Sequence, residues 1–127
     1  MGHIFKKHYT RDEARALLPQ IRLWLQQISE ARQRLAEQDQ RLSSLLSCGQ
    51  DVGGETVNQW AKTFAEIKET LGEFQKRAIQ IKDFDRGLID FPSILGGKEV
   101  FLCWEQEEED IEFWHDLHSG YAGRERL

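Results

Sequence analysis

The 127-residue chain has the size of one domain and, at 14.9 kDa, leaves no room for two independent cores. Charged residues make up 31% of it, yet four Trp, seven Phe and two Tyr supply bulky groups that disordered chains lack. No apolar run approaches the roughly 18 residues of a membrane span, and the first residues carry no apolar signal segment. We therefore expect a soluble, cytoplasmic protein with a single domain over residues 1–127.

The charge is uneven along the chain. Residues 1–82 carry 13 basic and 10 acidic side chains, whereas residues 83–127 carry 4 and 12. An acidic module repels phosphate backbones, which argues against nucleic acid as a partner. The acidic run over residues 105–110 is typical of a solvated loop, although such a run also attracts cations.

The first predicted helix covers residues 10–48. Thr10 and Glu13 form the sequence signature of a capping box, in which each residue satisfies a backbone N–H of the other. Apolar residues then recur in steps of three and four from Leu17 to Leu45, which is the pattern of a heptad seam. The glycines of residues 49–54 predict a turn after this helix.

A second heptad seam predicts a helix over residues 55–82. Its members are Val57, Trp60, Phe64, Ile67, Leu71, Phe74, Ala78 and Ile81. If the chain folds back near residue 51, the two seams meet as a long antiparallel helical hairpin of the coiled-coil type, with Trp24 facing Ala78. Leu18 and Leu25 widen the apolar stripe at the open end of this hairpin, so we expect another element to pack there.

Residues 83–127 have a different period and predict a small β module. The three candidate strands are residues 88–91, which Pro92 ends, residues 100–104 and residues 110–114. Three strands are marginal on their own. We therefore expect a three-stranded antiparallel meander packed at the open end of the hairpin, in an α+β fold that is mostly α.

Five segments of the chain are similar to the motifs of a known family. They are TRDEARALLP at residues 10–19, DRGLIDFP at residues 85–92, LCW at residues 102–104, FWH at residues 113–115 and GYAGR at residues 120–124. Over nearly its whole length the chain resembles the bacterial domain of unknown function 2203 family. This resemblance implies no activity, substrate or cofactor. The chain departs from the family at His118, where an acidic residue is usual.

The carboxy-terminal motifs contain candidate residues for a binding pocket. These candidates are Arg86, Asp90, Trp104, His115 and Arg124. Two guanidinium groups beside tryptophan faces suit a small anion or a carboxylate ligand. The alternative is structural: Arg86 and Arg124 would form ion pairs with Asp85, Asp90 or Asp116 that hold the module in place.

Two chemical alternatives use the same region. His115 and His118, together with Glu105 or Asp116, would suit a transition metal. Cys103 and His115 would resemble a nucleophile and its base. Neither spacing matches a known catalytic motif, and glycine-rich phosphate or dinucleotide motifs are missing from the sequence. We therefore expect no catalytic residue, no metal and no cofactor.

The helices predict a different class of function, that of an interaction or scaffold protein. Asp51 and Glu55 would lie at the tip of the hairpin, where they are candidate contacts for a protein partner. Leu46, Ala61 and Ala65 lie outside the seams and favour a second copy of the chain, since symmetric homodimers are the commonest oligomers. We expect a non-catalytic, self-associating protein, with ligand binding in the carboxy-terminal module as the alternative.

Overall fold

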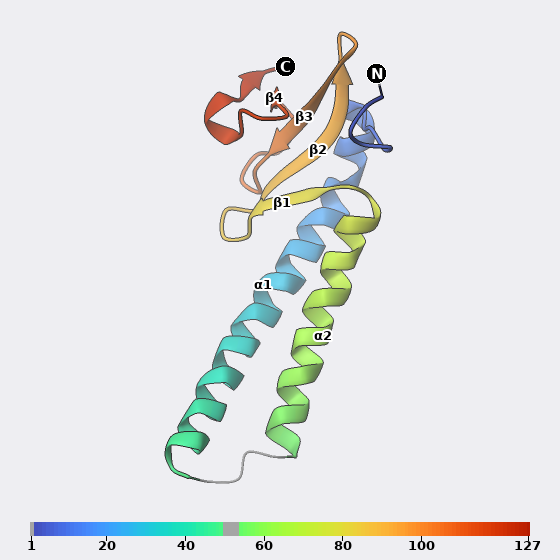
Figure 1. The fold of residues 1–127 in the computed structure, drawn as a ribbon. Helices are drawn as coiled ribbons and strands as arrows, with labels where there is room; N and C mark the ends of the chain where they lie inside the picture. Colours follow the sequence, from blue (N-terminus) through green and yellow to red (C-terminus); the bar gives the residue numbers. More distant parts are fainter. Residues whose placement is uncertain (1, 50–53) are drawn as a thin grey trace. The chain divides into compact units, whose positions relative to one another are not determined.

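The computed structural model describes residues 2–49 and 54–127, and within these ranges the protein has an α+β fold, as the sequence predicts. Two helices precede a five-stranded antiparallel sheet, whose strands lie in chain order (Figure 1). The elements are α1 (Arg11–Ser47), α2 (Glu55–Lys76), β1 (Gln80–Asp83), β2 (Leu88–Leu95), β3 (Lys98–Trp104), β4 (Phe113–Asp116), the 3-10 helix η1 (Tyr121–Gly123) and β5 (Glu125–Arg126). No helix in the described ranges combines the length and the apolar character needed to cross a bilayer.

The described chain forms two compact units. The sheet unit lies within Met1–Leu25 and Glu73–Leu127, and therefore includes the start of α1 and the end of α2. The helix unit, Gln26–Gly72, contains the remainder of both helices. Inside the helix unit Arg34 pairs with Glu66 at 2.6 Å, and further along α1 the Trp60 Nε1–H group donates to Asp39 at 2.5 Å. The two helices are therefore antiparallel there.

The start of α1 is as the sequence predicts. The Glu13 N–H group donates to the Thr10 hydroxyl at 3.1 Å, and the Thr10 N–H group donates to the Glu13 carboxylate at 2.9 Å, which completes the capping box. Leu18 and Leu25 are both 4% exposed within the sheet unit. Both leucines of the widened stripe are therefore buried, as the sequence predicts.

The end of α2 corrects the predicted length of the second helix, which stops at Lys76 and not at residue 82. The N–H group of Ile79 donates to the Phe74 carbonyl at 3.0 Å, and that of Ala78 donates to the Gln75 carbonyl at 3.1 Å. This pair of hydrogen bonds is the Schellman motif, whose left-handed position is here filled by Ala78 with a φ of 58°. The chain then enters β1, which contains Ile81.

The predicted register between the helices was also wrong. Trp24 packs edge-on against Phe74, with ring centroids 5.4 Å apart, so its aromatic partner lies about one turn before Ala78. In the helix unit Thr63 is 4% exposed, whereas Val57 and Phe64, which were placed in the seam, are 38% and 44% exposed. The inward face of α2 is therefore rotated relative to the predicted seam.

The sheet is an antiparallel meander, but it has five strands where the sequence predicts three. The first two predicted strands lie within β2 and β3, whereas the third, predicted over residues 110–114, overlaps β4 only at Phe113 and Trp114. The missed strands are short: β1 was assigned to the second helix, and β5 has only two residues. Each pairs along one edge of the meander, β1 with β2 and β5 with β4.

Pro92 lies inside β2 and does not end it, contrary to prediction. β1 pairs with β2 only as far as Asp90, so the outer edge of β2 is free of β1 from Phe91 onward. Proline is tolerated at such an edge because its missing N–H group would have no strand to bond. The Tyr9 N–H group donates to the Pro92 carbonyl at 2.7 Å along this edge.

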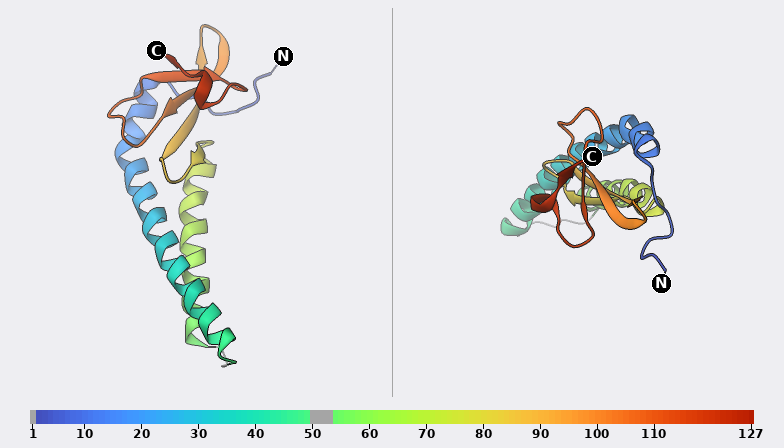
Figure 2. Two further views of the ribbon diagram at one scale, coloured as in Figure 1. Left: turned by 90° about the vertical axis from the view of Figure 1, so that its left-hand side faces the viewer. Right: turned by 90° about the horizontal axis from the view of Figure 1, so that it is seen from above.

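The two faces of the sheet carry different side chains because alternate residues of a strand point to opposite sides. The inner face is apolar: the ring of Tyr9, which precedes α1, lies against Phe91, and the guanidinium of Arg22 in α1 lies over Trp104. The outer face carries Phe101 and several polar residues. The carboxy-terminal segment, red in Figure 2, follows β4 and adds η1 and β5 to the sheet unit.

The first residues of the amino-terminal segment meet one carboxylate, that of Glu99 at the start of β3. It accepts hydrogen bonds from the N–H groups of Ile4 at 2.8 Å and Phe5 at 3.0 Å, and it contacts His8 Nε2 at 2.7 Å. Desolvation opposes ionisation of Glu99, but the hydrogen bonds from His8 and the two N–H groups outweigh it and lower the pKa to about 2.

We expect Ala78→Gly to stabilise the protein by about 0.5–1 kcal/mol. The left-handed conformation costs a non-glycine residue about 1–2 kcal/mol, and the greater freedom of glycine in the unfolded chain offsets about 0.4–1 kcal/mol of that gain. Denaturant unfolding of the full chain measures the change. Ala65→Gly, at an exposed position inside α2, is the matched control and should cost about 1 kcal/mol. Equal losses for both variants would contradict the Schellman end.

Acidification should detach the amino-terminal segment only at very low pH. The folded-state pKa of Glu99 lies below its ordinary value of 4.5, so its stabilising effect is complete above 4.5 and is lost as the pH falls toward about 2. NMR of the Ile4 and Phe5 amide protons across this range measures the midpoint, and the Leu102 amide reports global unfolding. A midpoint near 4.5 for Ile4 and Phe5 would contradict this attachment.

Candidate functional site

Three buried polar residues meet on the outer face of the sheet. Asp90 on β2 pairs in register with Cys103 on β3, and His115 on β4 pairs with Phe101, two residues before Cys103. Asp90, Cys103 and His115 are 2%, 0% and 2% exposed. One potential ligand atom from each lies within 4.8 Å of the others. We call these three residues the polar cluster.

The hydrogen bonds of His115 restrict where protons sit in the polar cluster. Its Nδ1 atom lies 2.6 Å from the Asp116 carbonyl oxygen, which only accepts, so Nδ1 carries a proton. Its Nε2 atom lies 3.0 Å from Asp90 Oδ2. Two lone pairs cannot face each other at this distance without repulsion. A positive species, either a proton or a metal ion, therefore belongs between Nε2 and Asp90.

The surroundings of Asp90 and Cys103 raise the pKa of both groups, so each holds its proton to a higher pH than it would in water. Burial raises the pKa of Asp90, and the neighbouring His115 and Lys82 oppose this effect. Burial, followed by the negative charge of Asp90, raises the pKa of the Cys103 thiol to about 12. The thiol lies beside the Asp90 carboxyl group, yet Oδ1 of Asp90 accepts no hydrogen bond of normal geometry from the described residues.

A cavity of about 250 Å³ adjoins the polar cluster. Asp90 and His115 form part of its wall, and Lys82 contributes a basic group. The remaining wall is apolar or comes from the segment after β4, and includes Leu88, Phe101, Leu117, His118, Gly120 and Tyr121. The cavity is therefore a place where a small molecule or ion can approach Asp90 and His115.

Arg86 and Arg124 meet at the ring of Tyr121. Their guanidinium carbons lie 4.1 Å and 4.5 Å from the ring centroid. Arg86 is ion-paired with Glu105, and Arg124 is ion-paired with Glu108, which were not among the expected partners. Both arginines are thus engaged by glutamates.

Arg124 also reaches the polar cluster. Its Nη1 atom lies 3.8 Å from the Cys103 sulfur, and its guanidinium lies 3.8 Å from the centre of the Phe113 ring. Arg124 is only 13% exposed as a side chain, and Glu108 is 16% exposed. The Arg124–Glu108 pair therefore brings a neutral, partly buried ion pair against the cysteine.

Trp104 lies apart from the other candidates, on the inner face of the sheet. Its Nε1–H group donates to the Glu108 carbonyl at 2.8 Å, and Arg22 of α1 covers its ring at 4.9 Å. Trp104 is 0% exposed. Asp90, His115 and Arg124 are brought together as candidates, Arg86 joins them only through Tyr121, and Trp104 faces the other way.

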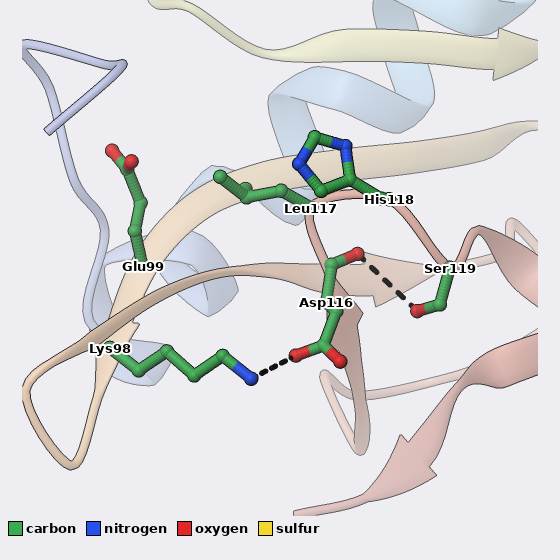
Figure 3. Close-up of a pocket in the computed structure, with 6 residues that line it drawn as sticks. All are labelled: Lys98, Glu99, Asp116, Leu117, His118 and Ser119. Atoms are coloured by element: carbon green, nitrogen blue, oxygen red, sulfur yellow. Dashed lines mark hydrogen bonds and ion pairs between the residues drawn. The ribbon is translucent and has the colours of Figure 1, made fainter.

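The four residues that the sequence offers as an alternative metal site, His115, His118, Glu105 and Asp116, do not converge. Asp116 is ion-paired with Lys98 at 2.7 Å, and its carbonyl faces the Ser119 hydroxyl, as Figure 3 shows. These groups line a separate cavity of about 480 Å³. His118 is exposed at the border of both cavities, and Glu105 pairs with Arg86.

Cys103 also lacks the properties of a nucleophile, because its thiol is buried and holds its proton. The sequence suggested Cys103 either as a nucleophile or, more commonly for such a position, as an inward-facing strand cysteine. Its place in the polar cluster could have been inferred from the alternation of side chains along the strands. Asp90 and Cys103 pair on adjacent strands and therefore point to the same face of the sheet.

The acidic run over residues 105–110 is not simply solvated. Glu105 and Glu108 pair with the two arginines, and Asp110 receives two hydrogen bonds from Arg15 of α1, at 2.7 Å and 3.0 Å. Arg22 donates to the carbonyls of Gln106 and Glu108. This loop therefore links the start of α1 to the arginines near the polar cluster.

The helix unit carries the second candidate surface. Asp51 lies outside the described residues, and Glu55 is an exposed residue at the first position of α2. Large apolar side chains are exposed on the same unit: Leu46 is 62%, Val57 is 38% and Phe64 is 44% exposed. Phe64 stacks on Trp60 with the ring centroids 5.5 Å apart. Ala61 and Ala65 are exposed as well.

Comparison with known proteins gives one family. The family model described as "Uncharacterized conserved protein (DUF2203)" matches residues 7–127, which include every residue of the polar cluster. No curated protein and no solved structure matches the chain.

The two cysteines should react very differently with a thiol-alkylating reagent. Cys48 is exposed, whereas Cys103 is 0% exposed. We expect native protein to take up one label at Cys48, with Cys103 labelled only after unfolding in denaturant. Mass spectrometry of the digested protein assigns each label. Rapid labelling of Cys103 in the native protein would contradict its position under Arg124.

Proposed function

This chain belongs to the DUF2203 family of uncharacterized conserved proteins, and we propose a function for it from its geometry. It is a non-catalytic interaction protein that pairs with a second copy of itself through the helix unit. The observation that carries the proposal is the exposure of Val57 and Phe64, at 38% and 44%, on a helix that turns Thr63 inward at 4%. A helix that packed only within its own chain would gain more by turning the larger apolar residues inward.

The inward threonines are stable in that position because their hydroxyls are satisfied within the helix. Thr63 donates to the Gln59 carbonyl at 3.0 Å, and Thr70 donates to the Glu66 carbonyl at 3.1 Å. Val57 and Phe64, which are one heptad apart, form an apolar stripe beside this threonine face. This arrangement supports an interface along the stripe of Val57 and Phe64.

The interior of the helix unit is too small to account for its apolar residues. Among the described residues of Gln26–Gly72, only Ile28, Ala31 and Thr63 are buried. Gln38 has a buried amide oxygen without a hydrogen-bond partner in the described chain, at a cost of about 1–3 kcal/mol. Fully burying one Phe side chain yields about 1.5–3 kcal/mol, and a two-fold axis would double each contact.

Small-ligand binding in the sheet unit is the second candidate function. It is favoured by the cavity of about 250 Å³ beside Asp90, whose Oδ1 lacks a partner among the described residues. The sequence pointed to an anionic ligand, but such a ligand would compete with Glu105 for Arg86 and with Glu108 for Arg124. A cation or a hydrogen-bond donor fits Asp90 better. A cytoplasmic location is part of this proposal for either candidate.

Phe64→Glu should convert the dimer to a monomer, because it would bury two charges at a two-fold interface. Light scattering on a sizing column at micromolar concentration should give twice 14.9 kDa for the wild type and 14.9 kDa for Phe64→Glu. Lys62→Glu is the matched control, since residue 62 lies about 160° around α2 from residue 64, and it should remain dimeric. A monomeric wild type would refute self-association.

A further inference from the structure

We propose that the polar cluster of Asp90, Cys103 and His115 binds one divalent transition-metal ion of the zinc type. This inference gives the second candidate function its ligand and does not depend on self-association. It rests on the convergence of three different donor groups on the outer face of the sheet, each at most 2% exposed.

The spacing of the donor atoms is near that of such a site and would have to adjust to hold the ion. Zinc binds nitrogen and oxygen at about 2.0–2.2 Å and sulfur at about 2.3 Å, so donors in a tetrahedral site lie about 3.3–3.8 Å apart. His115 Nε2 and Asp90 Oδ2 are 3.0 Å apart, and all three donors lie within 4.8 Å of one another. Side-chain shifts of about 1 Å would complete the three-ligand geometry.

The hydrogen bond behind His115 prepares it as a ligand. Its Nδ1–H group donates to the Asp116 carbonyl at 2.6 Å, which leaves the Nε2 lone pair pointing toward Asp90. Metal-binding histidines commonly donate their second ring N–H group to a backbone carbonyl in this way, which fixes both the tautomer and the ring orientation. A metal ion between Nε2 and Asp90 would remove the repulsion between the two lone pairs.

The charge of the polar cluster also suits a divalent ion. A thiolate, a carboxylate and a neutral imidazole around a doubly positive ion form a neutral site, which costs least to bury. The Arg124 charge near the Cys103 sulfur is balanced by Glu108, so it adds no net positive charge there. Asp90 Oδ1 has no hydrogen-bond partner among the described residues, so this oxygen is available to an ion.

The type of metal follows from the donors. Thiolate and imidazole select zinc, cobalt or iron over magnesium and calcium, which prefer oxygen ligands. Three protein ligands leave a fourth position open. Asp90 and His115 also line the cavity of about 250 Å³, so a water molecule or a small ligand has room to occupy that position.

A second group of donors, His3, His8 and Glu99, serves as an internal comparison. Glu99 already holds the amino-terminal segment through the N–H groups of Ile4 and Phe5. This carboxylate is thus already engaged by the backbone of the amino-terminal segment, and we assign the metal to the polar cluster. The presence of sulfur in one group alone makes the two sites distinguishable by spectroscopy.

Cobalt(II) titration of the chelator-treated, full-length protein tests the proposal. We expect one equivalent to bind and to give the near-ultraviolet sulfur-to-cobalt charge-transfer band that thiolate coordination produces. Cys103→Ser should abolish this band and weaken zinc binding by about tenfold or more. Cys48→Ser is the matched control, because Cys48 is exposed and lies in the helix unit, and it should behave as wild type.

Two further measurements separate loss of metal binding from loss of folding in Cys103→Ser. Circular dichroism and thermal melting establish whether Cys103→Ser folds. X-ray absorption of the zinc-loaded wild type needs no variant, and it should show one sulfur neighbour at about 2.3 Å. The monomeric variant Phe64→Glu should still bind one equivalent of metal, so a failure of self-association and a failure of metal binding give separate readouts.

Three outcomes would overturn the proposal. The first is that no cobalt or zinc binds at stoichiometric concentration. The second is a bound ion with only nitrogen and oxygen neighbours. The third is binding that survives Cys103→Ser but disappears in His8→Ala, which would place the ion at the amino-terminal group of donors.

Discussion

The contact between His115 and Asp90 is the constraint around which the sheet unit is organised. It joins β2 to β4 across the intervening strand, and both side chains are almost completely withdrawn from water. Ionisable groups in such a place need compensation close by. Neighbouring groups supply this compensation. The Asp116 carbonyl accepts a hydrogen bond from the imidazole, and the Arg124–Glu108 ion pair lies beside Cys103.

Much of the fold could be predicted from the sequence where local chemistry decides. The capping box at Thr10 and Glu13 depends on residues three apart, and the covered stripe at Leu18 and Leu25 depends on helical period alone. The end of α2 could not be read in this way, because Ala78 is a strong helix former and takes a left-handed conformation only when the following chain enters the sheet. The prediction that Pro92 ends its strand failed for a similar reason. Whether a strand accepts proline depends on where the neighbouring strand stops.

The candidate site, like the fold, could be predicted only where local chemistry decides. Asp90, His115 and Arg124 were found because their chemistry is recognisable in the carboxy-terminal motifs; Asp90 contacts His115, and Arg124 contacts Cys103 of the same cluster. Strand alternation separates Trp104 from Asp90 by placing them on opposite faces, and this signal was present in the sequence once the register was known. The glutamate partners of Arg86 and Arg124 come from a loop whose path depends on contacts with α1, which no local pattern encodes.

The hydrogen bond from Tyr9 to Pro92 closes part of a free strand edge. Beyond Asp90 the strand edge of β2 would otherwise present carbonyl groups to any extended peptide, and such an edge is a template for intermolecular strand addition. Proline removes one donor from this edge, and the backbone of the amino-terminal segment occupies the adjacent acceptor. The backbone just before α1 therefore covers part of a strand edge that would otherwise be open to the addition of another strand.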